Sequence, residues 1–378
     1  FFWDWMFLYF IWISSVSKVQ INKKRESVKI IKHKSKKSNR AMSGKTAIFI
    51  VTILALVSAV HSSKCHVLAL EGGGSNGAFQ AGALHELIYS LPKEDTPFQA
   101  VSGISTGTLN SIGFATHPIG NETAVADFIY DLWSTVTQSD VWTSWDLGVT
   151  EGFLDKGGIY NSAALGKFLE EMVPSNHTER SVYMGTDDLN TGAFVINYNK
   201  ALDREDYLYA ARSSAAAPFF FPPISWQSPI GPQTDTDGGT KMNLNLLSAI
   251  RHCLLEGYDE SDIVVDAAMC FTPGAVPTFN PSTQNTLDML GYVKNMWFYN
   301  FANYYIAEVM HAYPLANFRY LLYPLKAIPS KNPIAPLNFD HDHLKGLLAQ
   351  GESDASEIIS WGPGVSWKQF IKGSTSAQ

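Results

Sequence analysis

The chain has 378 residues, of which 46% are hydrophobic and 17% charged, and this composition predicts a large globular domain rather than a fibrous or disordered chain. The first 45 residues hold 11 of the 28 Lys and Arg residues but only 2 of the 35 Asp and Glu residues. The remaining chain has 17 basic and 33 acidic residues, and this formal charge of −16 excludes nucleic acid as a partner and electrostatic attraction to anionic lipid.

Residues 1–62 lack the pattern of a folded domain. Residues 1–41 join a short apolar run to a basic stretch of low complexity, and we interpret them as a non-native extension upstream of Met42. Residues 42–62 have the layout of a secretory signal peptide, with an apolar run at 47–57 followed by small residues. We therefore expect a secreted protein or one in the lumen of the secretory pathway. The alternative is a membrane anchor formed by the apolar run at 1–13.

Two further features bear on the compartment. Cys65, Cys253 and Cys270 allow one internal disulfide and leave one thiol. Asn121 and Asn176 each begin an N-glycosylation acceptor pattern, which fits secretion.

From residue 65 to about residue 365, apolar runs alternate with stretches of helical spacing, which predicts one α/β domain with a parallel sheet covered by helices. We expect strands at residues 67–71, 98–102, 182–185, 194–197, 263–268 and 318–323. We expect helices at residues 78–90, 106–115, 246–256, 286–307 and 343–359. The aromatic-rich stretch 128–145 is predicted to form a helical cap or insertion near the sheet edge.

A candidate nucleophile follows the second expected strand. Ser105 is the centre of the run Gly-Ile-Ser-Thr-Gly at residues 103–107, directly before an expected helix. A sharp strand-to-helix turn exposes such a serine, and the small neighbours let the strand and the helix approach each other. The helix N-terminus would supply N–H groups where an oxyanion forms. A glycine-rich turn with an N-capping serine remains the structural alternative.

The run Gly-Gly-Gly-Ser-Asn-Gly at residues 72–77 follows the first expected strand. It formally matches the dinucleotide fingerprint, but that site needs an acidic residue at the end of the second strand, where this chain has the serine turn. The alternatives are a tight structural turn or bare N–H groups beside Ser105 that stabilise an oxyanion.

A candidate base lies in a polar segment after Pro232, which we predict to be a loop. Asp237 precedes two glycines, so it forms either a common turn or a carboxylate that reaches the serine hydroxyl. A Ser-Asp-His triad would instead need a later histidine. The candidates are His252, His311, His341 and His343. The run Asp-His-Asp-His at 340–343 fits a triad histidine, a metal site or the start of a helix.

Taken together, these segments resemble the patatin-like phospholipases over nearly the whole chain after residue 62. The runs at 70–74, 103–107 and 237–239 occur in the family's order, and the runs at 188–192 and 213–219 look like further signature stretches. The resemblance implies a patatin-like three-layer fold with a mostly parallel central sheet and helices on both faces. It also implies a Ser105–Asp237 dyad without a catalytic histidine, cofactor or metal.

The same resemblance implies that Gly72, Gly73 and Gly74 form the oxyanion hole, and that five further glycines complete the motifs: Gly77, Gly103, Gly107, Gly238 and Gly239. The chain departs from the family at Asn76, where the family commonly has Arg or Lys. Asn can donate a hydrogen bond but carries no charge, which affects recognition of a phosphate headgroup more than hydrolysis.

The leading interpretation is therefore a serine lipid acyl hydrolase, a phospholipase A or lipolytic esterase, that acts at a membrane or micelle surface. The alternatives are an α/β-hydrolase-type esterase with a Ser-Asp-His triad and a non-catalytic storage or defence protein. A site for long acyl chains needs an apolar approach, for which the candidates are Phe219, Phe220, Phe221 and Trp226.

Overall fold

The computed structural model describes residues 64–271, 280–283, 285–328 and 336–375. The chain divides into two units, Phe1–Ser62 and Ser63–Gln378, and all described residues belong to the second. The predicted extension at 1–41, the predicted signal peptide at 42–62 and the alternative anchor at 1–13 lie outside the described residues.

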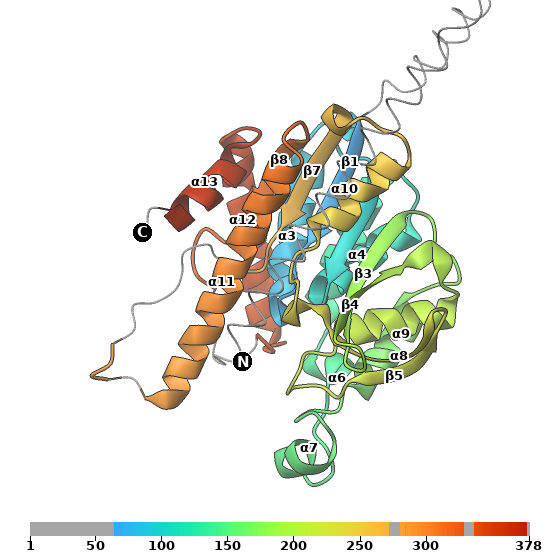
Figure 1. The fold of residues 1–378 in the computed structure, drawn as a ribbon, viewed down its shortest axis with the longest axis vertical. Coiled ribbons are helices and arrows are strands. Elements are labelled where there is room, and N and C mark those ends of the chain that lie inside the picture. Colours follow the sequence, from blue (N-terminus) through green and yellow to red (C-terminus); the bar gives the residue numbers. More distant parts are fainter. Residues whose placement is uncertain (1–63, 272–279, 284, 329–335, 376–378) are drawn as a thin grey trace, which may run out of the picture. The chain divides into compact units, whose positions relative to one another are not determined.

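An eight-stranded sheet forms the centre of the domain (Figure 1), in the order β5-β6-β3-β2-β1-β7-β8, with β4 also paired to β3. Five neighbouring strands are parallel: β1 (Cys65–Leu70), β2 (Phe98–Ile104), β3 (Ser181–Asp188), β7 (Ile263–Ala268) and β8 (Asn317–Leu322). The antiparallel strands are β4 (Ala193–Tyr198), β5 (Ile224–Ser228) and β6 (Gly231–Asp237). Every residue of β1 is buried, as expected of a central strand with both faces covered.

Helices cover both faces of the sheet, which confirms the three-layer prediction. One layer contains α3 (Gly77–Ser90), α4 (Thr106–Thr116), α5 (Glu122–Thr135) and α12 (His341–Ser360). α10 (Leu246–Leu255) covers the opposite face (Figure 1) and contacts α11 (Thr286–Ala312). α3 and α12 touch backbone to backbone, because a Cβ on Gly82 would lie 2.1 Å from the Leu348 carbonyl oxygen. Within the described residues, we find no helix that is long and apolar enough to cross a bilayer.

The remaining elements extend this core. α9 (Arg204–Ser214) packs on β3, β5 and β6, α8 (Ala163–Met172) packs on α9, and α13 (Val365–Thr375) packs on β8. The short helices are α6 (Gln138–Val141) and α7 (Val149–Asp155), and 3-10 turns occur at Gly74–Asn76, Lys93–Asp95, Asn199–Ala201, Gly238–Thr240 and Glu260–Asp262.

The strands and helices predicted from the apolar runs are present, with ends that differ by a few residues. The prediction of a loop around Asp237 was wrong. This polar segment is β6, which pairs with β3 and β5, and Pro232 fits because it lies beside the β5–β6 turn. The stretch 128–145 is not a cap along its whole length, since residues 128–135 belong to α5, which packs against α3 through buried side chains such as Trp133.

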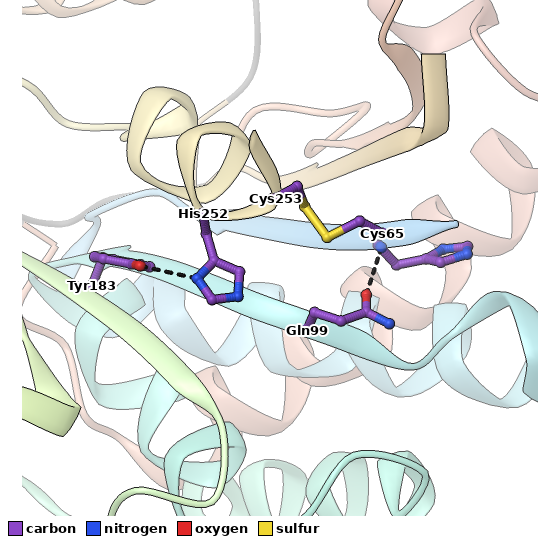
Figure 2. The surroundings of a disulfide bond; sticks show 6 residues. Cys65, Gln99, Tyr183, His252 and Cys253 are labelled. Carbon is purple, nitrogen blue, oxygen red and sulfur yellow. Dashed lines mark hydrogen bonds between the residues drawn. A yellow bond between two sulfur atoms is a disulfide. The ribbon is translucent and has the colours of Figure 1, made fainter. Parts of the chain in front are cut away.

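Cys65 and Cys253 form a disulfide, and Cys270 is a buried free thiol, as the odd cysteine count predicts. The disulfide joins the first residue of β1 to the last turn of α10, so it fixes α10 at the amino end of the parallel strands. Figure 2 shows His252 beside it, with Nδ1 hydrogen-bonded to the Tyr183 hydroxyl at 3.0 Å. Burial lowers the pKa of His252.

Candidate active site

Ser105 lies at the carboxyl end of β2, in the turn that begins α4. Its backbone has φ 53° and ψ −123°, a conformation that residues other than glycine rarely adopt. Two contacts hold it: its N–H donates to Ser214 Oγ at 3.0 Å, and its carbonyl accepts from the Thr108 N–H at 2.9 Å. The half-buried side chain therefore stands at a helix N-terminus, where the first N–H groups have no acceptor within the helix.

Asp237 reaches the same place from another strand. Ile104 of β2 lies opposite Gly185 of β3, and the next residue of β3, Thr186, lies opposite Asp237 of β6. Neighbouring strands are about 4.8 Å apart, so the two candidate side chains meet across a single intervening strand. Gly238 permits this approach, since a Cβ on it would lie 2.6 Å from the Gly185 carbonyl oxygen.

The Asp237 carboxyl is buried beside the serine. Burial raises its pKa to about 6, although hydrogen bonds from the Ser105 side chain and the Gly239 N–H lower it. The bond from Gly239 is 2.8 Å long. Within the described part of the chain these two groups are its hydrogen-bond partners, and no histidine is among them. A carboxylate with a pKa near neutrality beside a hydroxyl has the properties of a general base.

The glycine loop runs past the other side of Ser105. A Cβ on Gly72 would lie 2.9 Å from Ser105 Cβ, which places the loop beside the serine. The Gly72 N–H donates to the Asn243 carbonyl at 3.0 Å, so it is already used. The N–H groups of Gly73 and Gly74 have no hydrogen-bond partner among the described residues. Gly74 has φ +56°, which favours glycine. Two of the three predicted donors are thus available.

The remaining motif glycines bring backbone segments together around the site. A Cβ on Gly107 would lie 2.3 Å from the Leu70 carbonyl oxygen, and one on Gly103 would lie 2.5 Å from the Gly107 carbonyl oxygen. A Cβ on Gly77 would lie 2.1 Å from Thr106 Oγ1. The starts of α3 and α4 therefore pack directly against each other at the ends of β1 and β2.

A family model for patatin-like phospholipases matches residues 68–250, the stretch that carries the glycine loop, Ser105 and Asp237. Residues 68–250 therefore belong to the patatin-like phospholipase family.

Two known proteins are similar to this chain, one in sequence and one in structure. A curated cGAMP-activated phospholipase of Escherichia coli (strain TW11681) is 29% identical over 187 residues, which are 44% of this chain and 50% of that protein. The chain thus spans about half the length of this relative. The crystal structure of VipD from Legionella pneumophila is similar over 80% of this chain and 67% of that chain, with 11% identity and a TM-score of 0.36, a likeness too weak to support an inference.

Within this patatin-like domain, Ser214 is a site residue that we did not single out from the sequence. Its hydroxyl accepts from the Ser105 N–H, donates to the Gly185 carbonyl at 2.7 Å and bonds to Thr108 Oγ1 at 2.8 Å. It therefore fixes the turn that carries Ser105 to β3. The signal was present in the signature-like run 213–219, but the sequence did not indicate which of its two serines matters.

Asn243 is a second residue that the sequence gave no reason to choose. Its side-chain Nδ2 donates to the Gly72 carbonyl at 2.9 Å, and its backbone carbonyl accepts from the Gly72 N–H. A Cβ on Gly239 would lie 2.6 Å from its Oδ1. Asn243 therefore joins the glycine loop of the patatin-like domain to the turn after Asp237.

Glu71 fixes the base of the same loop. It is buried and accepts from the Cys270 N–H at 2.8 Å. Burial raises its pKa to about 8, despite hydrogen bonds from Cys270, the Asn243 side chain and Phe271. The carboxyl is therefore largely neutral at pH 7. Burial and the neighbouring Glu71 raise the pKa of the Cys270 thiol, so this thiol is not a nucleophile.

The structure also shows the surroundings of Asn76, the position at which the chain departs from the family. Asn76 is buried, and its Nδ2 donates to the Cys270 carbonyl at 3.0 Å. The amide is thus used inside the protein to hold the loop against the end of β7. The Asn76 Nδ2 group therefore has an acceptor inside the protein.

The candidate triad histidines have other surroundings. His252 lies next to the disulfide, at the amino end of strands whose carboxyl ends carry the site, and a six-residue strand separates the two ends by about 20 Å. His311 lies in the last turn of α11, before β8 begins. Asp340 caps α12 by accepting from the His343 N–H at 3.2 Å, so the run 340–343 is a helix start. Searched within the described ranges alone, the chain has no cluster of three His, Cys, Asp or Glu residues that could hold a metal.

The four predicted apolar residues fall into two groups. Phe220, Phe221 and Trp226 are buried, and Trp226 donates from Nε1 to Asp235 at 2.9 Å. Phe219 is 81% exposed and has φ +70°, an unusual conformation for a bulky residue. Only Phe219 is thus presented to the outside.

Proposed function

We propose that this protein is a serine lipid acyl hydrolase, a phospholipase A or lipolytic esterase, with Ser105 as nucleophile and Asp237 as general base. One observation carries the proposal: a buried carboxyl with a pKa near 6 is hydrogen-bonded by the side chain of a serine at a helix N-terminus. Such a pair can activate the serine without a third residue.

The reaction follows from these positions. Ser105 Oγ attacks the ester carbonyl carbon while its proton passes to the Asp237 carboxylate. The negative oxygen that forms is stabilised by the N–H groups of Gly73, Gly74 and Thr106. The carbon–oxygen bond to the alcohol then breaks, and Asp237 returns the proton to the alcohol. Water cleaves the acyl-enzyme by the same two steps, with Asp237 again as the base.

The roles of the other residues follow from their contacts. Ser214 holds the backbone of the nucleophile, and Asn243 keeps the glycine loop beside the base. The proposal needs no metal and no cofactor. We also propose that residues 65–365 form one patatin-like acyl hydrolase domain.

The test is hydrolysis of soluble short-chain esters and of lipid by the wild type and by Ser105→Ala. We expect full loss in the variant, and we expect a phosphonate ester probe to label Ser105 as seen by mass spectrometry. A triad esterase is the outcome if one of the histidines after Asp237 proves as essential as Ser105 in a folded variant. A storage or defence protein is the outcome if the wild type neither hydrolyses esters nor reacts with the probe.

We further propose that the protein is secreted or lies in the lumen of the secretory pathway. The disulfide supports an oxidising compartment, and Asn121 and Asn176 are both exposed. We expect mass spectrometry to find a mature N-terminus between Val60 and Cys65, and glycosidase treatment to lower the mass. A mature chain that retains residues 23–37 would contradict the cleavage site.

A further inference from the structure

An excursion of the chain carries large apolar side chains into solvent. This excursion consists of residues 143–161, between α6 and α8. An antiparallel β-bridge between Thr143 and Asn161 joins its two ends. Trp142 and Tyr160 pack together at this base, with ring centroids 4.0 Å apart. α7 forms the tip of the excursion and lies apart from the other helices (Figure 1).

α7 exposes three large apolar side chains. Gly152 is the buried residue of this helix, and a Cβ on it would lie 2.7 Å from Ile159 Cα. At 100° per residue, Leu154 lies on the side away from Gly152, Phe153 lies about 100° from Gly152 and Val149 about 60° from it. Their side chains are 54%, 78% and 71% exposed, and Leu147 just before the helix is 79% exposed.

The base of this excursion contacts the loop that carries Phe219. The Ile159 N–H donates to the Phe219 carbonyl at 3.0 Å, and Phe219 is itself exposed on a strained backbone. The loop with Phe219 begins at Ser214, whose hydroxyl holds the Ser105 N–H. We call Leu147, Val149, Phe153, Leu154 and Phe219 the apolar tip. Large exposed apolar patches on soluble domains mark interaction surfaces.

We propose that the apolar tip anchors the enzyme to the surface of uncharged or zwitterionic lipid and thereby brings the Ser105 site to its substrate. This inference rests on the proposed function for the identity of the partner, because the family implies a lipid substrate. An interfacial helix inserts its apolar face at the boundary of headgroups and acyl chains.

The charges around the apolar tip select the kind of lipid. The excursion carries Asp146, Glu151 and Asp155 against one cation, Lys156. Lys156 is already paired with Glu151 at 3.1 Å. The excursion therefore offers no free positive charge to anionic headgroups, and its insertion depends on apolar area alone. Binding is accordingly insensitive to salt and not strengthened by anionic lipid.

The test measures partition of the full chain onto phosphatidylcholine vesicles, in a Ser105→Ala background so that the vesicles stay intact. The test variant is Phe153→Asn with Leu154→Asn. Removing two largely exposed anchors should weaken partition roughly 100-fold, because each buried side chain of this kind accounts for about a tenfold change. The matched control is Leu255→Asn with Leu315→Asn, at two residues that are 83% and 66% exposed next to the amino ends of the strands. It should partition like the parent.

Four outcomes decide the proposal. Weaker partition of the test variant alone, with unchanged turnover of a soluble short-chain ester in the active background, supports it. Equal partition of the parent, the test variant and the control overturns it. A parent dimer that the test variant turns into a monomer, with no vesicle binding by either, overturns it in favour of an interface between two copies. Partition that rises severalfold on anionic vesicles and falls with salt overturns the apolar mechanism. A failure of the proposed function would look different from a failure of this inference. In that case the apolar tip still binds vesicles, but the wild type hydrolyses no ester.

Discussion

Replacing Asp237 by Asn should abolish activity and at the same time stabilise the protein above pH 6. Asn has nearly the same shape, and its oxygen can still accept from the Gly239 N–H, but an amide cannot take the serine proton. Activity should fall by about 10² to 10⁴, the usual contribution of a general base. The stability change comes from the charge, because the buried carboxylate must be ionised at neutral pH.

The size of the stabilisation follows from the pKa. Burial raises the pKa of Asp237 from 3.8 to about 6. Burying the ionised carboxylate costs free energy of folding, whereas burying the protonated carboxyl does not. The cost is therefore small at low pH and reaches its full value once the pH has risen above the folded-state pKa of about 6. Two pKa units correspond to about 3 kcal/mol, so Asp237→Asn should be more stable by up to about 3 kcal/mol at pH 8 and by about half of that at pH 5.

The assay is urea unfolding of both proteins at pH 5 and pH 8, with activity on a soluble ester measured alongside. Asp188→Asn is the matched control. Burial raises the pKa of Asp188, but hydrogen bonds from Thr191, Asn190 and Thr234 bring it below the usual value. This control should therefore lose stability at pH 8. An Asp237→Asn protein that keeps its activity, or whose difference in stability does not grow with pH, would refute the reasoning.

Further predictions concern the same site. The kcat/KM of the wild type should rise through an acid limb near pH 6, the pKa of Asp237, and fall about tenfold at pH 5; a limb that moves with a histidine substitution would contradict this. Ser214→Ala should lower kcat about tenfold and stability by about 1–3 kcal/mol, whereas Ser213→Ala, whose buried hydroxyl has no partner among the described residues, should change neither. Gly73→Ala places a Cβ 2.2 Å from another side chain and should lower kcat by about 10² to 10³; near-full turnover in a folded protein would make the loop structural only. Asn243→Ala should lower kcat with little change in KM, and an equal loss of thermal stability and activity would indicate a purely structural role.

Local patterns in the sequence determined most of the elements. The central strands are continuous apolar runs, and α3 and α4 follow directly after glycine-rich turns, so each could be placed from its own residues. The run around Ser105 specified a strand-to-helix turn, because small residues are needed on both sides of it. The segments 70–74, 103–107 and 237–239 then indicated the family.

Only the tertiary structure decided what is formed by pairing across the sheet. β6 is polar and contains Pro232, so its own residues predicted a loop, and it is a strand because β3 and β5 satisfy its backbone groups. The same pairing brings Asp237 level with Ser105 and buries it, which raises its pKa. Which glycine N–H remains available is likewise settled from outside the loop, by the carbonyl of Asn243, more than 170 residues away along the chain. Hydrogen bonds and burial between distant segments leave no period or spacing in the sequence, and the chemistry of this site depends on them.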